Sequence, residues 1–340
     1  MNDAAVALAY KHCERITRSR ARNFYYGIRL LPPRKRAAMC ALYAMARRID
    51  DVGDSVALSP APGRAARTST GPHGLERDEP DQGEPNRGEP NRGEPESGPE
   101  QDGPVQEGKA AALDDIRRSL SLLAKSSSGL PAATLPPGDP VLAALADTAG
   151  KFPLPIHALE ELVEGCSWDL AGRRYQTFDE LVEYCRRVAG TIGRLSLAIY
   201  GSSDPEQAEP LADALGVALQ LTNILRDLVE DREVMGRVYL PAEDLERFGV
   251  SAALEGAPDD LSALICFESG RAEAWYERGL ELLPMLDSRS RACTGAMAGI
   301  YHRLLDRIRS RPESVLSGRL SLSPVEKGRV ALTALARAAA

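Results

Sequence analysis

The 340-residue sequence lacks the features that mark several common classes of protein. Its six cysteines are scattered, and none forms the CxxC pair that a zinc site or a redox motif needs. No run of about 18 uncharged apolar residues is present, so no membrane-spanning helix is expected. The opening residues MNDA lack the basic-then-apolar order of a secretory signal. We therefore expect a cytoplasmic protein with reduced cysteines, which act as small buried apolar side chains.

The chain also lacks an excess of basic residues. The 42 Lys and Arg residues are outnumbered by 49 Asp and Glu, which gives a net charge of −7. A nucleic-acid-binding protein would normally be basic, so no nucleic-acid partner is expected. The four histidines show no metal-ligand spacing, and neither zinc nor haem is expected.

The alternation of apolar and polar residues that is typical of β-strands is almost absent. Apolar residues instead recur at steps of three and four, the period of an amphipathic helix. The sequence therefore predicts an all-α fold. The predicted helices cover residues 3–18, 33–56, 110–127, 139–150, 155–171, 177–201, 205–234, 258–285 and 289–310.

Residues 57–110 differ in composition from the rest of the chain. Near-repeats of Gly-Glu-Pro-Asn-Arg occupy residues 83–92, and large apolar side chains are almost absent. Such a segment cannot bury enough surface to offset its ordering entropy, so we predict a disordered insert, with a partner-docking tail as the alternative. Because the motifs need both sides of it, residues 1–56 and 111–323 are predicted to form one domain, followed by a C-terminal tail or helix at 324–340.

The predicted helix at 33–56 ends in a cluster of acidic residues. Asp50 and Asp54 are four residues apart, so they project from one face about one turn from each other. Like charges at this spacing destabilise a helix by about 0.2–0.5 kcal/mol, and a hard divalent cation would offset the repulsion. The alternative is an ordinary solvated helix end.

A second acidic cluster lies in the predicted helix at 205–234. Gln220, Asn223, Asp227 and Asp231 follow one another at steps of 3, 4 and 4, so they share one face of the helix. The residues around them are apolar on nearly all sides, which is typical of a buried helix. We therefore expect this polar stripe to line an internal cavity, rather than face solvent. Two such clusters in one chain favour a shared metal site.

A third element is the segment YCRRVAGTIG at residues 184–193. The small side chains of Ala189, Gly190 and Gly193 leave one helix face without bulk. Glycine inside a helix costs roughly 1 kcal/mol relative to alanine, so its presence needs a reason. Close packing against another helix and the approach of a long hydrocarbon explain it equally well.

Together these residues form a recognisable pattern, and the chain resembles the squalene/phytoene synthase family of head-to-head prenyl synthases. The blocks that carry the resemblance are RNFY (22–25) with LP (31–32), ALYAMARRIDDVGD (41–54), RYQTF (174–178), YCRRVAGTIG (184–193), QLTNILRDLVED (220–231) and GRVYLP (236–241). Within the family, ARNFYYGIRLLPP (21–33) and GRVYLPAEDLERFG (236–249) are most similar to bacterial presqualene diphosphate synthases.

The resemblance implies a single isoprenoid synthase helical bundle with a central cavity, in which two aspartate-rich helices hold magnesium bridged to diphosphate. The residues that match metal ligands are Asp50, Asp54, Asn223, Asp227 and Asp231. The residues that match substrate or diphosphate contacts are Arg22, Asn23, Arg47, Gln220, Asn223, Arg226 and Tyr301. The implied catalytic residues are the four aspartates and Tyr184, which matches a tyrosine near the reacting centre. Many members carry serine at the position of Asn23, whose amide N–H can still donate to a phosphate oxygen.

The implied reaction is the condensation of two farnesyl diphosphates to presqualene diphosphate, with release of diphosphate, in squalene and hopanoid biosynthesis. The expected cofactor is Mg²⁺, with Mn²⁺ as a substitute, and no NADPH is expected for this product. The expected partners are farnesyl diphosphate, downstream squalene or hopanoid enzymes and, because the product is lipophilic, the inner face of a membrane at its periphery.

Three alternatives stay open. A phytoene synthase would perform the same chemistry on two geranylgeranyl diphosphates, and a squalene synthase would further reduce the product with NADPH. From a different class, the chain could be a non-catalytic helical scaffold.

Overall fold

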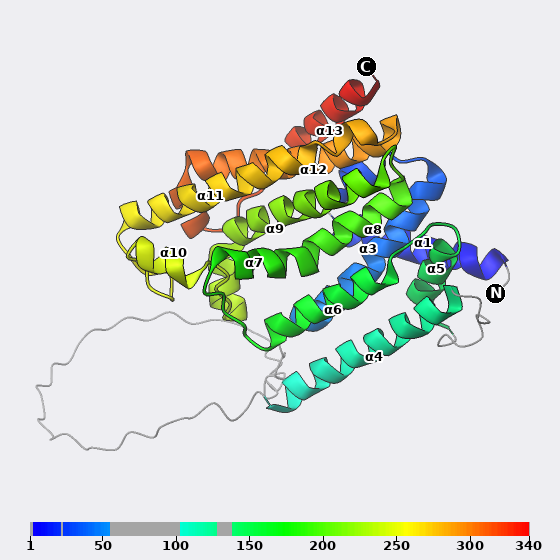
Figure 1. Ribbon diagram of the computed structural model, residues 1–340, viewed down its shortest axis with the longest axis horizontal. Coiled ribbons are helices and arrows are strands. Elements are labelled where there is room, and N and C mark those ends of the chain that lie inside the picture. The colour runs from blue at the N-terminus through cyan, green and yellow to red at the C-terminus, as the bar shows by residue number, and fades with distance from the viewer. Residues whose placement is uncertain (1–2, 22, 55–102, 128–137, 340) are drawn as a thin grey trace, which may run out of the picture.

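The computed structural model describes residues 3–21, 23–54, 103–127 and 138–339 (Figure 1). Within these ranges the side chains at 54, 103–105, 126 and 127 are not described. The described chain contains helices and no strand, which confirms the predicted all-α fold.

The helices run in chain order as α1 Asp3–Arg20, α2 Phe24–Ile28, α3 Pro33–Asp54, α4 Gly103–Ser127, α5 Pro140–Ala149, α6 Ile156–Leu170, α7 Phe178–Cys185, α8 Thr191–Tyr200, α9 Pro205–Met235, α10 Ala242–Arg247, α11 Pro258–Leu280, α12 Ser288–Ser310 and α13 Pro324–Ala339. A π-helical turn, Arg186–Gly190, joins α7 to α8, so the predicted helix at 177–201 is nearly continuous. Two short elements, α2 and α10, were not predicted because they contain less than two turns of apolar periodicity.

Aspartate side chains cap the N-termini of several of these helices. Asp139 Oδ1 accepts hydrogen bonds from the backbone N–H groups of Val141 (2.9 Å) and Leu142 (3.1 Å) at the start of α5. Asp204 caps α9 and Asp287 caps α12 in the same way. A carboxylate at this position satisfies backbone donors that have no partner inside the helix, which fixes where the helix begins.

The predicted insert at 57–110 lies mostly outside the described residues. Its last part does not, because α4 begins at Gly103. Residues 103–110 are therefore helical, and the predicted boundary at 110 is too late. Pro104 lies in the first turn of α4, where proline is tolerated. The Pro and Gly residues typical of the insert therefore extend into the first turn of the helix, and for this reason the sequence did not reveal where the helix begins.

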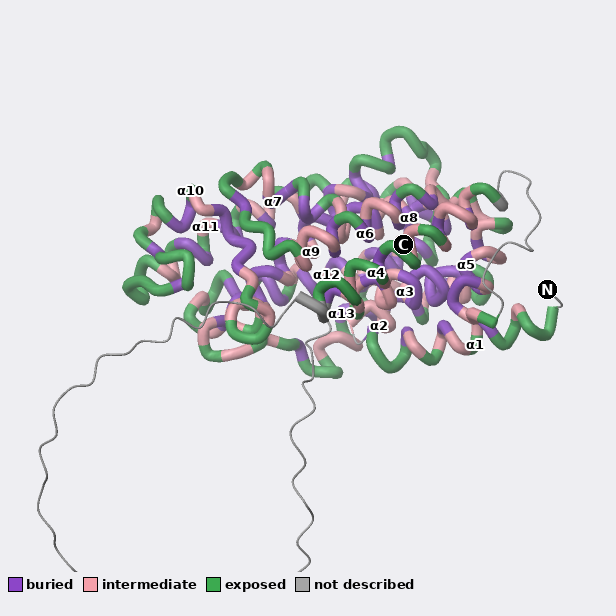
Figure 2. Tube along the Cα trace, turned by 90° about the horizontal axis from the view of Figure 1, so that it is seen from below, coloured by how far each residue is buried: buried purple, intermediate pink, exposed green. Residues whose placement is uncertain are grey.

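The longest helix, α9, lies at the centre of the described fold (Figures 1 and 2). It packs against α8, α11 and α12, and most of its residues from Leu211 to Leu228 are buried. This confirms the expectation of a buried helix. One apolar core forms mainly among α1, α3, α5, α6 and α8, and a second among α7, α9, α11 and α12.

The last helix, α13, packs along α12 (Figure 1). Val330 and Ala331 are buried in this contact, and a Cβ atom at Gly299 of α12 would lie 2.8 Å from Val330 Cγ1. Residues 324–339 therefore form a packed terminal helix.

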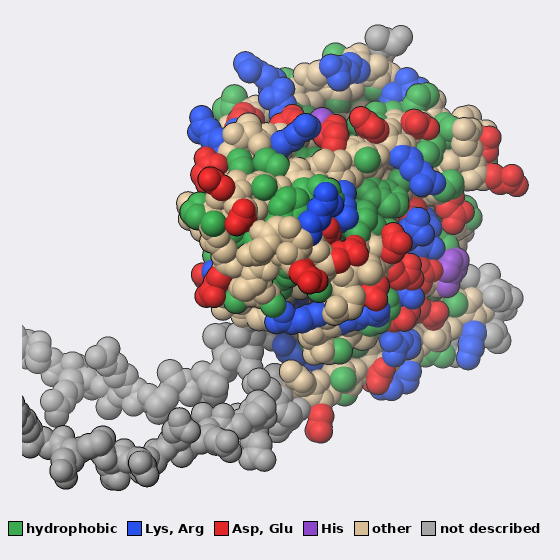
Figure 3. Space-filling model, turned by 60° about the vertical axis from the view of Figure 1, so that its left-hand side comes forward, with side chains coloured by type: hydrophobic (Ala, Val, Ile, Leu, Met, Phe, Trp, Pro, Cys, Tyr) green, Lys and Arg blue, Asp and Glu red, His purple; other side chains and the backbone are tan. Residues whose placement is uncertain are grey.

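No helix among the described residues has the length and hydropathy needed to cross a membrane. Figure 3 shows acidic and basic side chains interspersed over one face, with hydrophobic side chains gathered between them.

Glycines allow α8 and the π-helical turn before it to approach α9 closely. A Cβ atom added at Gly193 would lie 2.1 Å from the backbone oxygen of Ala212, and one at Gly216 would lie 2.3 Å from that of Ala189. These backbone atoms cannot move aside as the end of a flexible side chain can, so only glycine fits at these two positions. The bare helix face predicted from the sequence therefore serves close helix packing.

Gly193→Ala should lower the free energy of unfolding by about 1–3 kcal/mol, because the two helices must separate to admit the methyl group. Gly270→Ala in α11 is the matched control, since a Cβ there meets nothing within 4 Å. That change should instead stabilise the protein by about 0.5–1 kcal/mol through helix propensity. Urea denaturation of both variants measures the difference, and equal effects would refute the packing explanation.

Candidate active site

A cavity of about 940 Å³ lies between α3, α8 and α9 and extends to residues of α6, α12 and the segment before α13. The predicted site residues that line it are Asn23, Arg47, Asp50, Tyr184, Gln220, Asn223, Arg226, Asp227, Asp231 and Tyr301. The other two predictions, Arg22 and the side chain of Asp54, lie outside the described residues. The fold thus brings residues that are up to 278 positions apart in the sequence to one cavity.

The lining follows α9 from Ala212 to Asp231, a length of about 28 Å at the rise of an α-helix. It follows α3 from Met39 to Asp50, about 16 Å. Arg237, just after α9, donates from Nη2 to the backbone oxygen of Gly53 (3.0 Å), which places the carboxyl ends of both helices together. The acidic residues therefore gather at one end of the cavity.

The opposite end of the cavity is mainly apolar. It is lined by Met39, Leu42, Leu197, Leu282 and Met297, together with Tyr200. Most of this wall is hydrocarbon, so this end suits a long hydrocarbon chain.

Arginines compensate the acidic side chains at the polar end. Arg47 Nη1 lies 2.6 Å from Asp50 Oδ2, and its Nη2 lies 2.5 Å from Asp51 Oδ1. Asp227 is contacted by two arginines: Arg226 Nε donates to Oδ1 (2.8 Å), and Arg319 Nε lies 3.0 Å from the same oxygen. A carboxylate in a low-dielectric cavity requires such compensation.

Asp231 is less well compensated than Asp227. Burial, followed by the charge of Asp227, raises the pKa of Asp231 to about 7, and Arg237 opposes this only in part. One turn before Asp227, the buried Oδ1 of Asn223 accepts no hydrogen bond from the described residues. Carboxylate and amide oxygens are the ligands that magnesium prefers, and the residues present fit such an ion.

Aromatic side chains flank the polar end. Tyr301 stacks on Phe24 with ring centroids 5.4 Å apart, and the guanidinium of Arg226 lies 5.9 Å from the centroid of the Tyr301 ring. Asn23 precedes α2, but its side chain makes no capping hydrogen bond. Its amide is therefore available to the cavity, which it lines.

The polar residues of the lining to which the sequence assigned no role include Asp169, Arg237, Tyr239, Arg319 and Lys327. Arg237 and Tyr239 belong to the GRVYLP block, so a signal existed for them. Arg319 lies outside every block, and only the path of the chain between α12 and α13 brings it to Asp227.

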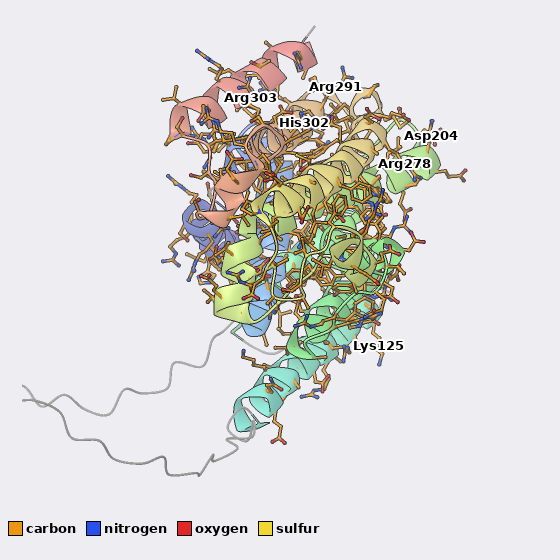
Figure 4. All side chains as sticks on the ribbon, turned by 90° about the vertical axis from the view of Figure 1, so that its left-hand side faces the viewer. Lys125, Asp204, Arg278, Arg291, His302 and Arg303 are labelled. Carbon is orange, nitrogen blue, oxygen red and sulfur yellow. The ribbon has the colours of Figure 1, made fainter. Side chains whose placement is uncertain are left out.

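A different set of metal-ligand types occurs between α11 and α12. His302 is labelled in Figure 4. Its Nε2 lies 2.8 Å from Glu273 Oε1, and its Nδ1 lies 3.9 Å from Asp306 Oδ2. None of the three residues lines the cavity described above. The hydrogen bond to Glu273 accounts for the position of His302.

Known structures identify the class of this fold. The crystal structure of a dehydrosqualene synthase aligns with a TM-score of 0.74 and 26% identity, covering 98% of this chain and 97% of that one. That of a squalene synthase from Alicyclobacillus acidocaldarius aligns with a TM-score of 0.68 and 25% identity, covering 91% and 96%. The chain has the helical fold of isoprenoid synthases.

A family model for squalene/phytoene synthases matches residues 17–326. A phytoene synthase of Mycobacterium tuberculosis is 43% identical over 334 residues, which cover 96% of this chain and 91% of that protein. A 15-cis-phytoene synthase of Synechocystis sp. is 36% identical, covering 93% and 81%. The chain belongs to the squalene/phytoene synthase family, whose members are prenyltransferases of the head-to-head type.

These relatives overturn the expected subfamily. The chain was expected to resemble presqualene diphosphate synthases of hopanoid pathways, and the relatives at 43% and 36% identity are phytoene synthases. The physical reason lies in the blocks that were used. Arg237 and Tyr239, from the block at 236–249, line the polar end of the cavity, where head-to-head synthases share the same diphosphate chemistry whatever the length of the prenyl chain.

Asp231→Asn should raise the melting temperature of the metal-free protein by a few degrees, because it removes a buried charge that Asp227 also disfavours. Thermal unfolding in EDTA measures the change. Asp260→Asn, at the exposed start of α11, removes the same charge without relieving burial and should not raise the melting temperature. A lower melting temperature for Asp231→Asn would contradict this account of the site.

Proposed function

We propose that the chain is a phytoene synthase that joins two molecules of geranylgeranyl diphosphate head-to-head. The observation that carries the choice of substrate is its 43% identity, over 96% of its length, to a phytoene synthase. The observation that carries the chemistry is a cavity with carboxylates and arginines at one end and apolar walls at the other. Such a cavity fits a substrate with a diphosphate head and a long hydrocarbon tail.

The side chains at the polar end suit the binding and activation of a diphosphate. Asp50, Asp227, Asp231 and Asn223 would hold magnesium, with Asp54 as a further predicted ligand. The metal, when bound, neutralises the charge of the departing diphosphate. Arg47, Arg226 and Arg319 bring guanidinium groups to the same end, and these match phosphate oxygens in geometry and charge.

The reaction requires no external oxidant or reductant. The C1–O bond of one substrate breaks, and its electron pair leaves with diphosphate. The resulting allylic cation is attacked by the C2–C3 double bond of the second substrate, and loss of a proton closes a cyclopropane. Ionisation of the remaining diphosphate, rearrangement and loss of a second proton then give a central double bond. A squalene synthase would instead end with hydride transfer from NADPH.

Exclusion of water is the second task of the site. An allylic cation that meets water becomes a prenyl alcohol, so the walls must be apolar and closely packed. The close approach of α8 and α9 at Gly193 and Gly216 supplies such a wall, because the two helices leave little space between them. Peripheral contact with a membrane, favoured by a lipophilic product, stays a prediction.

Asp227→Asn should reduce formation of the coupled product by at least about 100-fold, because the site loses one of the carboxylates that would hold the metal at the diphosphate. It should also abolish the rise in melting temperature that magnesium and a geranylgeranyl thiodiphosphate together cause. Asp260→Asn serves as the control and should retain both properties. Near-normal turnover by Asp227→Asn would contradict the role of the acidic end, and a helical scaffold without activity would show neither property in the wild type.

The choice of substrate has its own test. Incubation with farnesyl or geranylgeranyl diphosphate and magnesium, with and without NADPH, should give phytoene from the C20 substrate, independent of NADPH. Product identification by chromatography and mass spectrometry decides the outcome. Preferred coupling of farnesyl diphosphate would refute the proposed substrate while leaving the head-to-head chemistry intact.

A further inference from the structure

One carboxylate in the cavity lies outside the two aspartate clusters. Asp169, near the end of α6, lines the polar end, and its side chain is 11% exposed. Its Oδ2 accepts a hydrogen bond from the hydroxyl of Tyr184 (2.8 Å), and its Oδ1 accepts one from the hydroxyl of Tyr239 (2.9 Å). Arg237 Nη1 lies 4.0 Å from Oδ2. Both oxygens of this carboxylate are therefore directed by tyrosines of the cavity wall.

The two tyrosines form a compact unit around Asp169. Their rings stack with centroids 5.2 Å apart, and the ring of Tyr175 packs on the pair. Burial raises the pKa of Tyr184 and of Tyr239 well above the usual value, so both stay protonated and act as donors. The two hydroxyl oxygens are 3.4 Å apart, and the shorter contacts to Asp169 take both hydrogens.

This arrangement determines what the hydroxyls offer to the cavity. A tyrosine hydroxyl has one hydrogen and two lone pairs. Because each hydrogen is directed at Asp169, the hydroxyl lone pairs, but no donated hydrogen, are left for a group in the cavity. A carbocation is stabilised by lone pairs, by the negative face of an aromatic ring and by a nearby negative charge in a low dielectric.

We propose that Asp169 is a positioning residue of the coupling reaction, which acts through Tyr184 and Tyr239 to stabilise the allylic cation. Asp169 accepts a hydrogen bond from each hydroxyl, so neither hydroxyl donates into the cavity. It also places a negative charge next to both hydroxyls. The proposal rests on the head-to-head chemistry proposed above, but not on the length of the prenyl chain. A purely structural role, in which Asp169 only links α6 to α7 and to the segment after α9, is the alternative.

Asp169→Asn distinguishes the two roles because it keeps the size and shape of the side chain. The amide has one acceptor oxygen and one NH₂ donor, so one tyrosine hydroxyl loses its acceptor and turns elsewhere, and the negative charge is lost. Asp169→Glu is the conservative variant that keeps the charge and both acceptors. Asp244→Asn, at a buried aspartate bonded to Arg271 outside the cavity, is the matched control for loss of a buried carboxylate.

The experiment measures kcat, KM and the ratio of coupled hydrocarbon to prenyl alcohol, with whichever diphosphate the wild type couples best. Asp169→Asn should lower kcat about 100-fold with KM changed less than about 3-fold, the loss typical of one preorganised electrostatic group. The product ratio should shift toward the alcohol, because a cation that is less well stabilised and held is quenched by water more often. Asp169→Glu should restore part of the kcat and of the product ratio, and Asp244→Asn should leave both unchanged.

Tyr239→Phe provides a second test that does not depend on the folding of Asp169→Asn. It leaves the charge of Asp169 and the ring in place but removes one directed hydroxyl, so it should lower the ratio of hydrocarbon to alcohol in the same direction. Wild-type kcat and product ratio for either Asp169→Asn or Tyr239→Phe would overturn the proposal. A rise in KM with unchanged kcat and product ratio would instead assign Asp169 to substrate binding and also overturn it.

The failure of this proposal differs from failure of the proposed function. If the wild type couples farnesyl rather than geranylgeranyl diphosphate, the substrate assignment fails, but the product ratio still tests Asp169. If the wild type forms no coupled product from either diphosphate, the function fails before any variant is compared.

Discussion

The structure depends on one electrostatic constraint: carboxylates from three helices share one end of the cavity. Asp50 of α3, Asp169 of α6, and Asp227 and Asp231 of α9 all line it. Like charges in a medium of low dielectric repel strongly, so this end of the bundle would not close without positive charge. The side chains that supply part of that charge are Arg47, Arg226, Arg237 and Arg319. Burial and the charge of Asp227 raise the pKa of Asp231, and Arg237 opposes this only in part.

Close packing of α8, and of the π-helical turn before it, against α9 forms one wall of the cavity. Gly193 lets α8, and Gly216 lets the π-helical turn, approach the backbone of α9 more closely than any side chain would allow. The π-helical turn at Arg186–Gly190 lies in the same region, between Tyr184 and the glycine-rich face. Irregular turns of this kind cost stability and are frequent at functional sites, where they direct a side chain that a regular helix would turn elsewhere. Tyr184 and the close helix contact are thus parts of one local arrangement.

The assignment of substrate illustrates a limit of motif reasoning. The motifs include the residues at the polar end of the cavity, and the proposed activation of diphosphate would need the same carboxylates and arginines for every prenyl chain. In that proposal the length of the prenyl chain would be limited at the apolar end, where Leu197, Leu282 and Met297 lie outside every motif and can be replaced by other apolar residues of similar size. The sequence therefore supported head-to-head coupling, and overall similarity to phytoene synthases, rather than any motif, is the basis for proposing a different substrate.

The sequence by itself determined the features that depend on local periodicity. The helical period specified the all-α fold, and the steps of 3, 4 and 4 from Gln220 to Asp231 placed a polar stripe on a buried helix, because neighbours on a helix are fixed by its geometry. Only the tertiary structure decided which distant groups meet that stripe. Arg319 reaches Asp227 from beyond α12, and Asp169 accepts hydrogen bonds from Tyr184 and Tyr239 across three segments. Such contacts depend on how helices pack, and one sequence contains no local signal for them.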